Sequence, residues 1–314
     1  MKTFKPMHFL IAILSFILGA GISVITAQDA PDVGPHPPGP EVKMTSHIGD
    51  VVGHSQNAKM DYRRYCAGCH GELGDGNGEV AQWFEPPLWP KPRDFTMAIF
   101  KCRSTLTGTL PTDEDLFNTI ARGITNSGMP PWNTFTRQQR ADLVAYIKTF
   151  SPRWQKEKAG DPITVPPEPP VTIESISHGK YLFTKLECWK CHGPQGKGDG
   201  PSASTLTDSK DNPIRPYNFA AGADDSRFKC GSTNRDIYKI FITGVDGTPM
   251  PSFADVIKPA DAWDLVHFLR TLQVHRRSKE NDVLKAAGGK IPDYVEKQAS
   301  APATGETNAV GGGN

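Results

Sequence analysis

Two short cysteine motifs hold the residues of this sequence that are best suited to chemistry. In each, a pair of cysteines is followed directly by a histidine: Cys66-Ala-Gly-Cys69-His70 and Cys188-Trp-Lys-Cys191-His192. At a helix end, two thiols at this spacing can form thioethers with the two vinyl groups of one porphyrin, and the adjacent imidazole can bind its iron. The sequence therefore predicts two covalently attached haem c groups, with His70 and His192 as iron ligands.

A single motif of this kind would also suit zinc or a redox disulfide. A zinc site would need a second ligand pair in each half of the chain, and the two other cysteines, Cys102 and Cys230, stand singly. The motif also occurs twice, each time after a stretch of helical pattern that carries aromatic residues. These observations favour haem over zinc.

Two methionines are the candidates for the second axial iron ligand. Met129 lies 59 residues after His70, and Met250 lies 58 residues after His192. A proline directly follows each methionine, and an aromatic residue lies three positions after the methionine. Methionine ligation raises the reduction potential of a haem. The alternative, a methionine that fills a gap in the core, does not explain why both stand at matching positions.

The two halves of the chain repeat other motifs in the same order, which predicts an internal duplication. The motif pairs are Gly74-Asp75-Gly76 with Gly198-Asp199-Gly200, residues 100–105 with 228–233, 115–123 with 236–244, and 128–132 with 249–253.

The hydrophobic pattern predicts a mostly α fold with helices and loops and no long strands. In the first half, helices are expected over 58–66, 113–122 and 137–150. In the second half, they are expected over 178–188, 234–243 and 259–272. We expect two tandem helical domains, over 55–151 and 175–274, each wrapped around one covalent haem.

The remaining segments are read as export and spacer sequences. Residues 1–27 have two lysines followed by an uncharged apolar stretch, which predicts a signal peptide or an N-terminal membrane anchor, and hence a periplasmic protein. Proline-rich stretches predict a spacer over 28–54 and a linker over 152–174. Residues 275–314 form a C-terminal extension that is expected to be partly disordered.

Composition limits the possible partners and suggests a non-protein core. The formal net charge is +1, which argues against a nucleic-acid partner because such proteins present a basic face. Only 37% of residues are hydrophobic, whereas the chain contains 30 glycines and 28 prolines. A buried macrocycle would supply apolar bulk that such a chain lacks.

Cys102 and Cys230 occupy matching positions outside the haem motifs, and three interpretations stay open. They are buried free thiols, or a disulfide between the two halves, or axial iron ligands. Arg93 and Arg215 lie in corresponding loops, where each is either a solvated side chain or a partner for a haem propionate.

With these motifs in place, each half resembles a class I cytochrome c domain. The resemblance covers 55–151 and 175–274 and implies that the first and last helices of each domain cross beside the haem. Tyr62 with Tyr146, and Tyr181 with Phe268, would lie near these crossings. The second half departs from the pattern, because one extra residue separates Phe183 from Cys188.

The resemblance implies one-electron transfer in a periplasmic respiratory chain, as a carrier or as a relay subunit of a membrane oxidoreductase. Expected partners are redox proteins, such as a quinol-oxidising complex, a terminal reductase or an oxidase. Two ligands on each iron would leave no position for a substrate, so no catalytic residue is expected. The alternatives are a di-haem enzyme, such as a peroxidase or a thiosulfate-oxidising cytochrome, and a redox or gas sensor.

Overall fold

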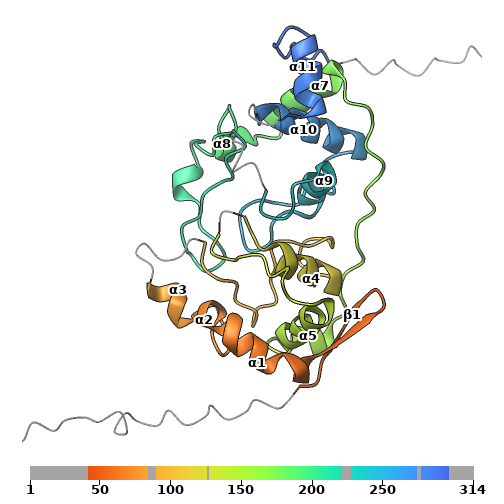
Figure 1. Ribbon diagram of the computed structural model, residues 1–314. Helices are drawn as coiled ribbons and strands as arrows, with labels where there is room; N and C mark the ends of the chain where they lie inside the picture. Colours follow the sequence, from red (N-terminus) through yellow and green to blue (C-terminus); the bar gives the residue numbers. More distant parts are fainter. Residues whose placement is uncertain (1–41, 84–89, 126, 221–227, 274–276, 297–314) are drawn as a thin grey trace, which may run out of the picture. The chain divides into compact units, whose positions relative to one another are not determined.

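The computed structural model describes residues 42–83, 90–125, 127–220, 228–273 and 277–296. These residues are mostly helical, as expected, with one small two-stranded sheet (Figure 1). The signal or anchor segment expected over 1–27 lies outside the described residues. Among the helices that are described, none has both the length and the apolarity to cross a bilayer.

The first half of the chain forms a short hairpin followed by a series of helices. Its elements are β1 (Thr45–Ile48), β2 (Val51–His54), α1 (Ser55–Tyr65), α2 (Ala67–His70), α3 (Glu79–Trp83), α4 (Asp113–Arg122), α5 (Arg137–Lys148) and α6 (Arg153–Lys156).

The hairpin corrects the expected spacer over 28–54. Strands β1 and β2 pair antiparallel and pack on α5. The Ser46 hydroxyl donates to the carbonyl of Ala141 at 2.7 Å, and the backbone N–H of His54 donates to the Asp142 carboxylate at 2.7 Å. The proline content of 28–40 does not extend into this hairpin, so the folded part begins well before residue 55.

Helices α1 and α5 cross at a cluster of aromatic rings. Tyr62 is fully buried, and its ring centroid lies 5.0 Å from those of both Tyr146 and Phe150. The contact between Tyr62 and Tyr146 agrees with the expectation from the resemblance.

The second half repeats the helical order of the first without the hairpin. Its elements are α7 (Ile173–Lys185), α8 (Trp189–His192), the 3-10 helix η1 (Ala203–Thr205), α9 (Asn234–Thr243), α10 (Pro259–Leu272) and α11 (Lys279–Ala286).

Helices α7 and α10 cross at Gly179. A Cβ atom on this residue would lie 2.0 Å from the backbone oxygen of Asp264, so only glycine allows the two helices to approach this closely. The aromatic pair at the crossing is Phe183 with Phe268, with centroids 5.4 Å apart. Phe183, and not Tyr181, thus forms the ring pair with Phe268 at this crossing, while the ring of Tyr181 lies 5.3 Å from that of Tyr294 in a tilted arrangement.

The end of α7 absorbs the extra residue of the second half. The N–H of Cys66 bonds to the carbonyl of Tyr62 four residues earlier, whereas that of Cys188 bonds to Phe183 five residues earlier. Glu187 takes up the wider turn in a left-handed conformation, with φ of 58°. This turn returns Cys188 to a position equivalent to that of Cys66.

The linker expected over 152–174 packs on the first half in part. Its helix α6 buries Trp154 against Phe100, with centroids 6.3 Å apart, and Thr105 forms a β-bridge with Pro162. Likewise, the described part of the extension expected over 275–314 is ordered, since α11 contacts α10 and Tyr294 packs on α7.

The two halves are joined by a disulfide and by a buried ion pair. Cys102 and Cys230 form a disulfide with a Cα–Cα distance of 5.1 Å. Beside it, the side chain of Arg103 is completely buried and contacts the Asp246 carboxylate at 2.6 Å. Of the three interpretations left open for the two cysteines, the structure contains the disulfide.

Candidate functional site

The first cysteine motif forms one wall of a cavity. Cys66 follows the end of α1, and the short helix α2 then carries Cys69 and His70. The backbone N–H of His70 bonds to the carbonyl of Cys66 at 2.9 Å, which closes this turn. Both thiols, the imidazole and Met129 line the same cavity, whose volume is about 270 Å³. The structure therefore brings together all four residues predicted for the first site.

A backbone carbonyl orients the imidazole of His70. Its Nδ1 lies 2.9 Å from the carbonyl oxygen of Arg93, and because a carbonyl only accepts, Nδ1 carries the proton. The ring also stacks on Phe95 with centroids 4.5 Å apart. Burial lowers the pKa of His70, although the bond to Arg93 acts against this shift. The neutral ring thus keeps the lone pair on Nε2 for a metal.

The second site has the same arrangement around His192. Its Nδ1 donates to the carbonyl of Tyr217 at 3.0 Å, and its ring stacks on Phe219 at 4.6 Å. Burial again lowers the pKa of this histidine. Cys188 and Met250 both pack against the buried core of the second half.

Glycine-rich loops bring these carbonyls and phenylalanines to the histidines. The N–H of Phe95 bonds to the carbonyl of Gly74 at 2.6 Å, and that of Phe219 to Gly196 at 2.7 Å. Gly74 thus corresponds to Gly196, so the motif pair Gly74-Asp75-Gly76 with Gly198-Asp199-Gly200 is out of register by two residues. The two Gly-Asp-Gly segments therefore do not align residue by residue, although Asp75 and Asp199 each place a carboxylate oxygen beside the equivalent glycines, Gly71 and Gly193.

The loops that carry the methionines have matching hydrogen bonds. The N–H of Ile124 bonds to the carbonyl of Met129 at 3.0 Å, and that of Val245 bonds to Met250 at 3.1 Å. The hydroxyl of Ser127 accepts from the N–H of Met129 at 3.2 Å, and Thr248 does the same for Met250 at 3.3 Å. Each methionine is therefore held by the loop that follows a middle helix, α4 or α9.

The surroundings of the thiols suit attachment to an apolar group. Burial raises the pKa of Cys66 to about 12, with smaller contributions from Asp61 and Cys69. Burial also raises the pKa of Cys188 to about 11. The first cavity is lined largely by apolar side chains, among them Phe100, Ile120 and Trp132. An apolar cavity with two neutral thiols, a ligating nitrogen and a thioether sulfur fits a covalently bound haem.

Several site residues were not found from the sequence. Phe95 and Phe219 each stand three residues after a proline, Pro92 and Pro216, and this shared pattern was the signal available. It also shows that Arg93 corresponds to Tyr217, and not to Arg215. Arg93 lines the first cavity, whereas Arg215 is exposed.

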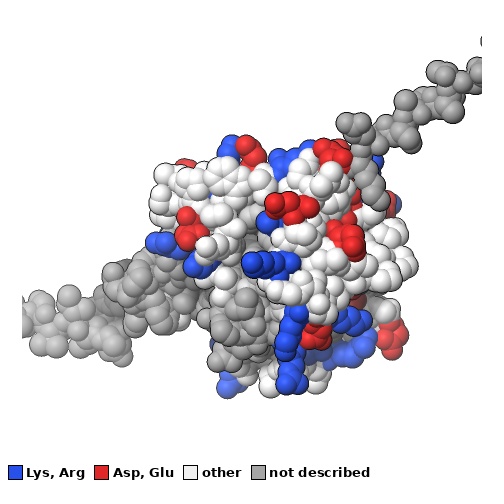
Figure 2. Space-filling model, turned by 90° about the horizontal axis from the view of Figure 1, so that it is seen from above, with Lys and Arg blue, Asp and Glu red and all other residues white. Residues whose placement is uncertain are grey.

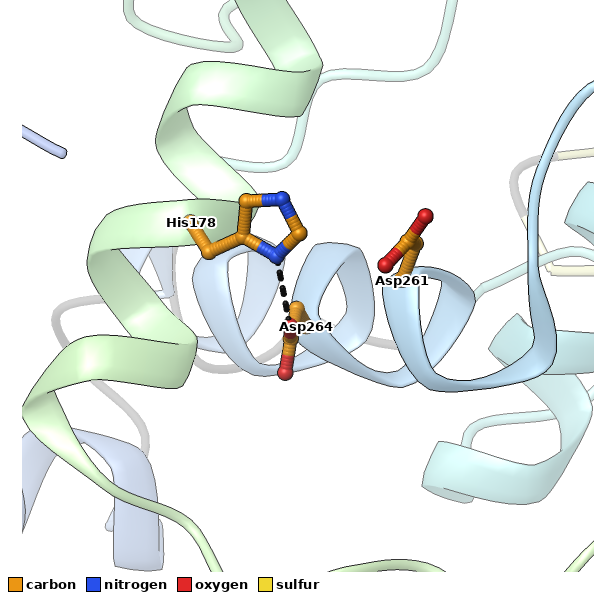
Figure 3. Close-up of side chains that lie close together, drawn as sticks. All are labelled: His178, Asp261 and Asp264. Carbon is orange, nitrogen blue, oxygen red and sulfur yellow. Dashed lines mark hydrogen bonds and ion pairs between the residues drawn. The ribbon is translucent and has the colours of Figure 1, made fainter. Parts of the chain in front are cut away.

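A group of potential metal ligands lies between α7 and α10. The ligand atoms of His178, Asp261 and Asp264 all lie within 4.8 Å of one another (Figure 3). Nδ1 of His178 donates to Asp264 at 2.8 Å, and Tyr294 packs on the imidazole with centroids 4.4 Å apart. These contacts hold α7 against α10 and the C-terminal extension against α7. The position of His178 beside Asp264 is therefore explained by packing, without a metal.

The fold and the two sites define a c-type cytochrome with two haem domains. The family model described as cytochrome C oxidase, cbb3-type, subunit III, matches residues 55–147, and the model described as cytochrome c matches 176–273. The chain therefore binds two covalently attached haem c groups, one in each domain.

Among solved structures, a chain of the Kuenenia stuttgartiensis reducing HAO-like protein complex Kustc0457/Kustc0458 is similar to this one. The two are 39% identical, with a TM-score of 0.66, and the match covers 74% of this chain and 100% of the other. No curated protein matches the chain. This chain belongs to the di-haem class I c-type cytochromes, and its domains support a role in electron transfer.

Proposed function

We propose that this protein is a periplasmic electron relay whose two haems are both ligated by histidine and methionine. Cys66 and Cys69 would attach the first haem, with His70 and Met129 as its axial ligands. The equivalent residues of the second site are Cys188, Cys191, His192 and Met250. The observation that carries the proposal is the position of His70 and Met129 on one cavity. With His70 and Met129 both bound to it, the iron would offer no site to a substrate.

The disulfide also favours a relay over the enzyme alternatives. A thiosulfate-oxidising cytochrome of the kind considered above would need a cysteine as axial ligand, for which Cys102 and Cys230 were the candidates. Both sulfur atoms are bonded to each other. A peroxidase would need an iron that opens an axial position, and both methionine loops are held by several hydrogen bonds.

The likeness to a chain of a reducing HAO-like protein complex supports a role as a partner subunit. We infer that this chain exchanges electrons with a larger redox protein, free in the periplasm or bound at the membrane. On the face shown in Figure 2, basic and acidic side chains are interspersed among larger uncharged areas. Such a surface suits docking to another protein more than binding to a polyanion.

Ligand binding by the purified holoprotein tests this proposal. We expect both haems to be low-spin and not to bind carbon monoxide when reduced. Met129→Ala and Met250→Ala should each open one haem to carbon monoxide, because the axial ligand is lost. Met60→Ala is the matched control, since Met60 is 70% exposed and has no counterpart in the repeat. A wild-type haem that is high-spin at rest would favour the enzyme alternative.

A further inference from the structure

Four basic side chains line the first haem cavity. Lys91 is exposed, whereas the other three are half-buried, and one of those three comes from the other domain. Arg93 and Lys101 belong to the first domain, whereas Lys229 belongs to the second, yet all three line the cavity that also contains His70 and Met129. No sequence argument placed Lys229 at the first site.

The disulfide brings the two lysines to the same place. Lys101 directly precedes Cys102 and Lys229 directly precedes Cys230, so the bond between the cysteines holds the lysines in adjacent segments. The guanidinium of Arg93 also lies at the boundary between the two domains. A Cβ atom on Gly247 of the second domain would lie 3.2 Å from Nη1 of Arg93. The cluster is therefore built from both domains.

Within the described part of the protein, none of these three side chains forms a hydrogen bond or an ion pair, although the charge of Asp208 acts on Arg93 and Lys101. Of the carboxylates whose charges act on them, Asp94 pairs with Lys210 and Asp246 with Arg103, while Asp208 accepts hydrogen bonds from Asn212. The pKa of Lys101 is lowered to about 7, chiefly by burial and to a smaller extent by the charges of Arg93 and Lys229, while Asp208 acts in the opposite direction. Half-buried like charges repel one another unless an anion joins them.

We propose that Arg93, Lys101 and Lys229 bind the propionates of the first haem, with Lys229 acting across the domain boundary. The haem attached at Cys66 and Cys69 brings two carboxylates to a cavity that is otherwise largely apolar, and the cations line that same cavity. The inference rests on the proposed first haem site.

The second haem lacks one of these charges. The position of Arg93 is occupied by Tyr217 in the second domain, as the matching bonds to His70 and His192 show. A nearby cation favours the reduced haem, because reduction adds a negative charge. Lys229 is thus a positioning residue of the second domain that raises the potential of the first haem.

A redox titration of the Lys229→Gln holoprotein tests the proposal. Met250→His is introduced into parent and variant alike, since loss of the methionine lowers the potential of the second haem and separates the two transitions. We expect the reduction equilibrium of the first haem to become less favourable by about threefold to tenfold. A tenfold change corresponds to about 59 mV for one electron. Propionate bending bands in resonance Raman spectra should shift as well.

Two further variants make the result specific. Lys258→Gln removes an exposed charge from the same domain and should change neither readout. Lys229→Arg keeps the charge and should restore most of the parent potential. If Lys229→Gln behaves like Lys258→Gln in both measurements, the cross-domain contact does not exist. Loss of covalent haem or a high-spin spectrum in the unmutated protein would instead count against the proposed function.

Discussion

Replacing Gly123 by alanine should detach Met129 from the first haem. Gly123 has a φ of 68°, and a Cβ atom there would lie 2.6 Å from the carbonyl oxygen of Met129 and 2.7 Å from the nitrogen of Pro131. An ordinary contact needs at least 3.4 Å, so the methionine loop must move away. With a ψ of −168°, Gly123 has a backbone conformation that is essentially restricted to glycine, which costs alanine about 1–3 kcal/mol, and the crowding adds about 1–3 kcal/mol.

Gly108→Ala separates the two contributions. Gly108 has a φ of 82° but nothing within 4 Å of the Cβ position, so alanine there meets only the backbone strain. Both variants should lose stability in urea, and only Gly123→Ala should bind carbon monoxide at the first haem. If the haems of both variants stay six-coordinate and do not bind carbon monoxide, then Gly123 does not position Met129.

Two other substitutions test the packing that holds the sites. Gly179→Ala should destabilise the second domain by about 1–3 kcal/mol in urea unfolding, because the new Cβ would lie 2.0 Å from the backbone oxygen of Asp264. Helix propensity alone predicts the opposite, so a stabilised variant would contradict the close crossing of α7 and α10. Asp246→Asn should cost about 3–5 kcal/mol because it leaves the buried charge of Arg103 unpaired. Arg103→Met removes that charge and should cost less; equal losses would show that the ion pair has no special role.

The helices and the candidate ligands could be predicted because local chemistry determines them. The structure has α4, α9 and α10 over the expected 113–122, 234–243 and 259–272. Thr112 and Thr233 form capping boxes at the starts of α4 and α9, and proline opens α10. These signals lie within a few residues of the helix ends, so no tertiary information was needed.

Features that depend on distant contacts were missed. Strand β1 is held by a hydrogen bond from Ser46 to Ala141, residues that are 95 positions apart. The place of Lys229 at the first cavity depends on a disulfide that spans 128 positions. A sequence pattern predicts which residues share a face of one element, but it contains no information on which elements meet.

The two sites share their ligand types but differ in the side chains around them. In the first domain, the hydroxyl of Tyr62 donates to the carbonyl of Gly71 at 2.8 Å, next to His70. The second domain has Phe183 at this crossing, which has no hydroxyl group to donate, and Tyr217 in place of Arg93. Because iron ligands of the same kind give similar intrinsic potentials, these surroundings must set any difference between the two haems. In the proposed relay, a difference between the potentials of the two haems would therefore arise from these surroundings and not from the ligand set.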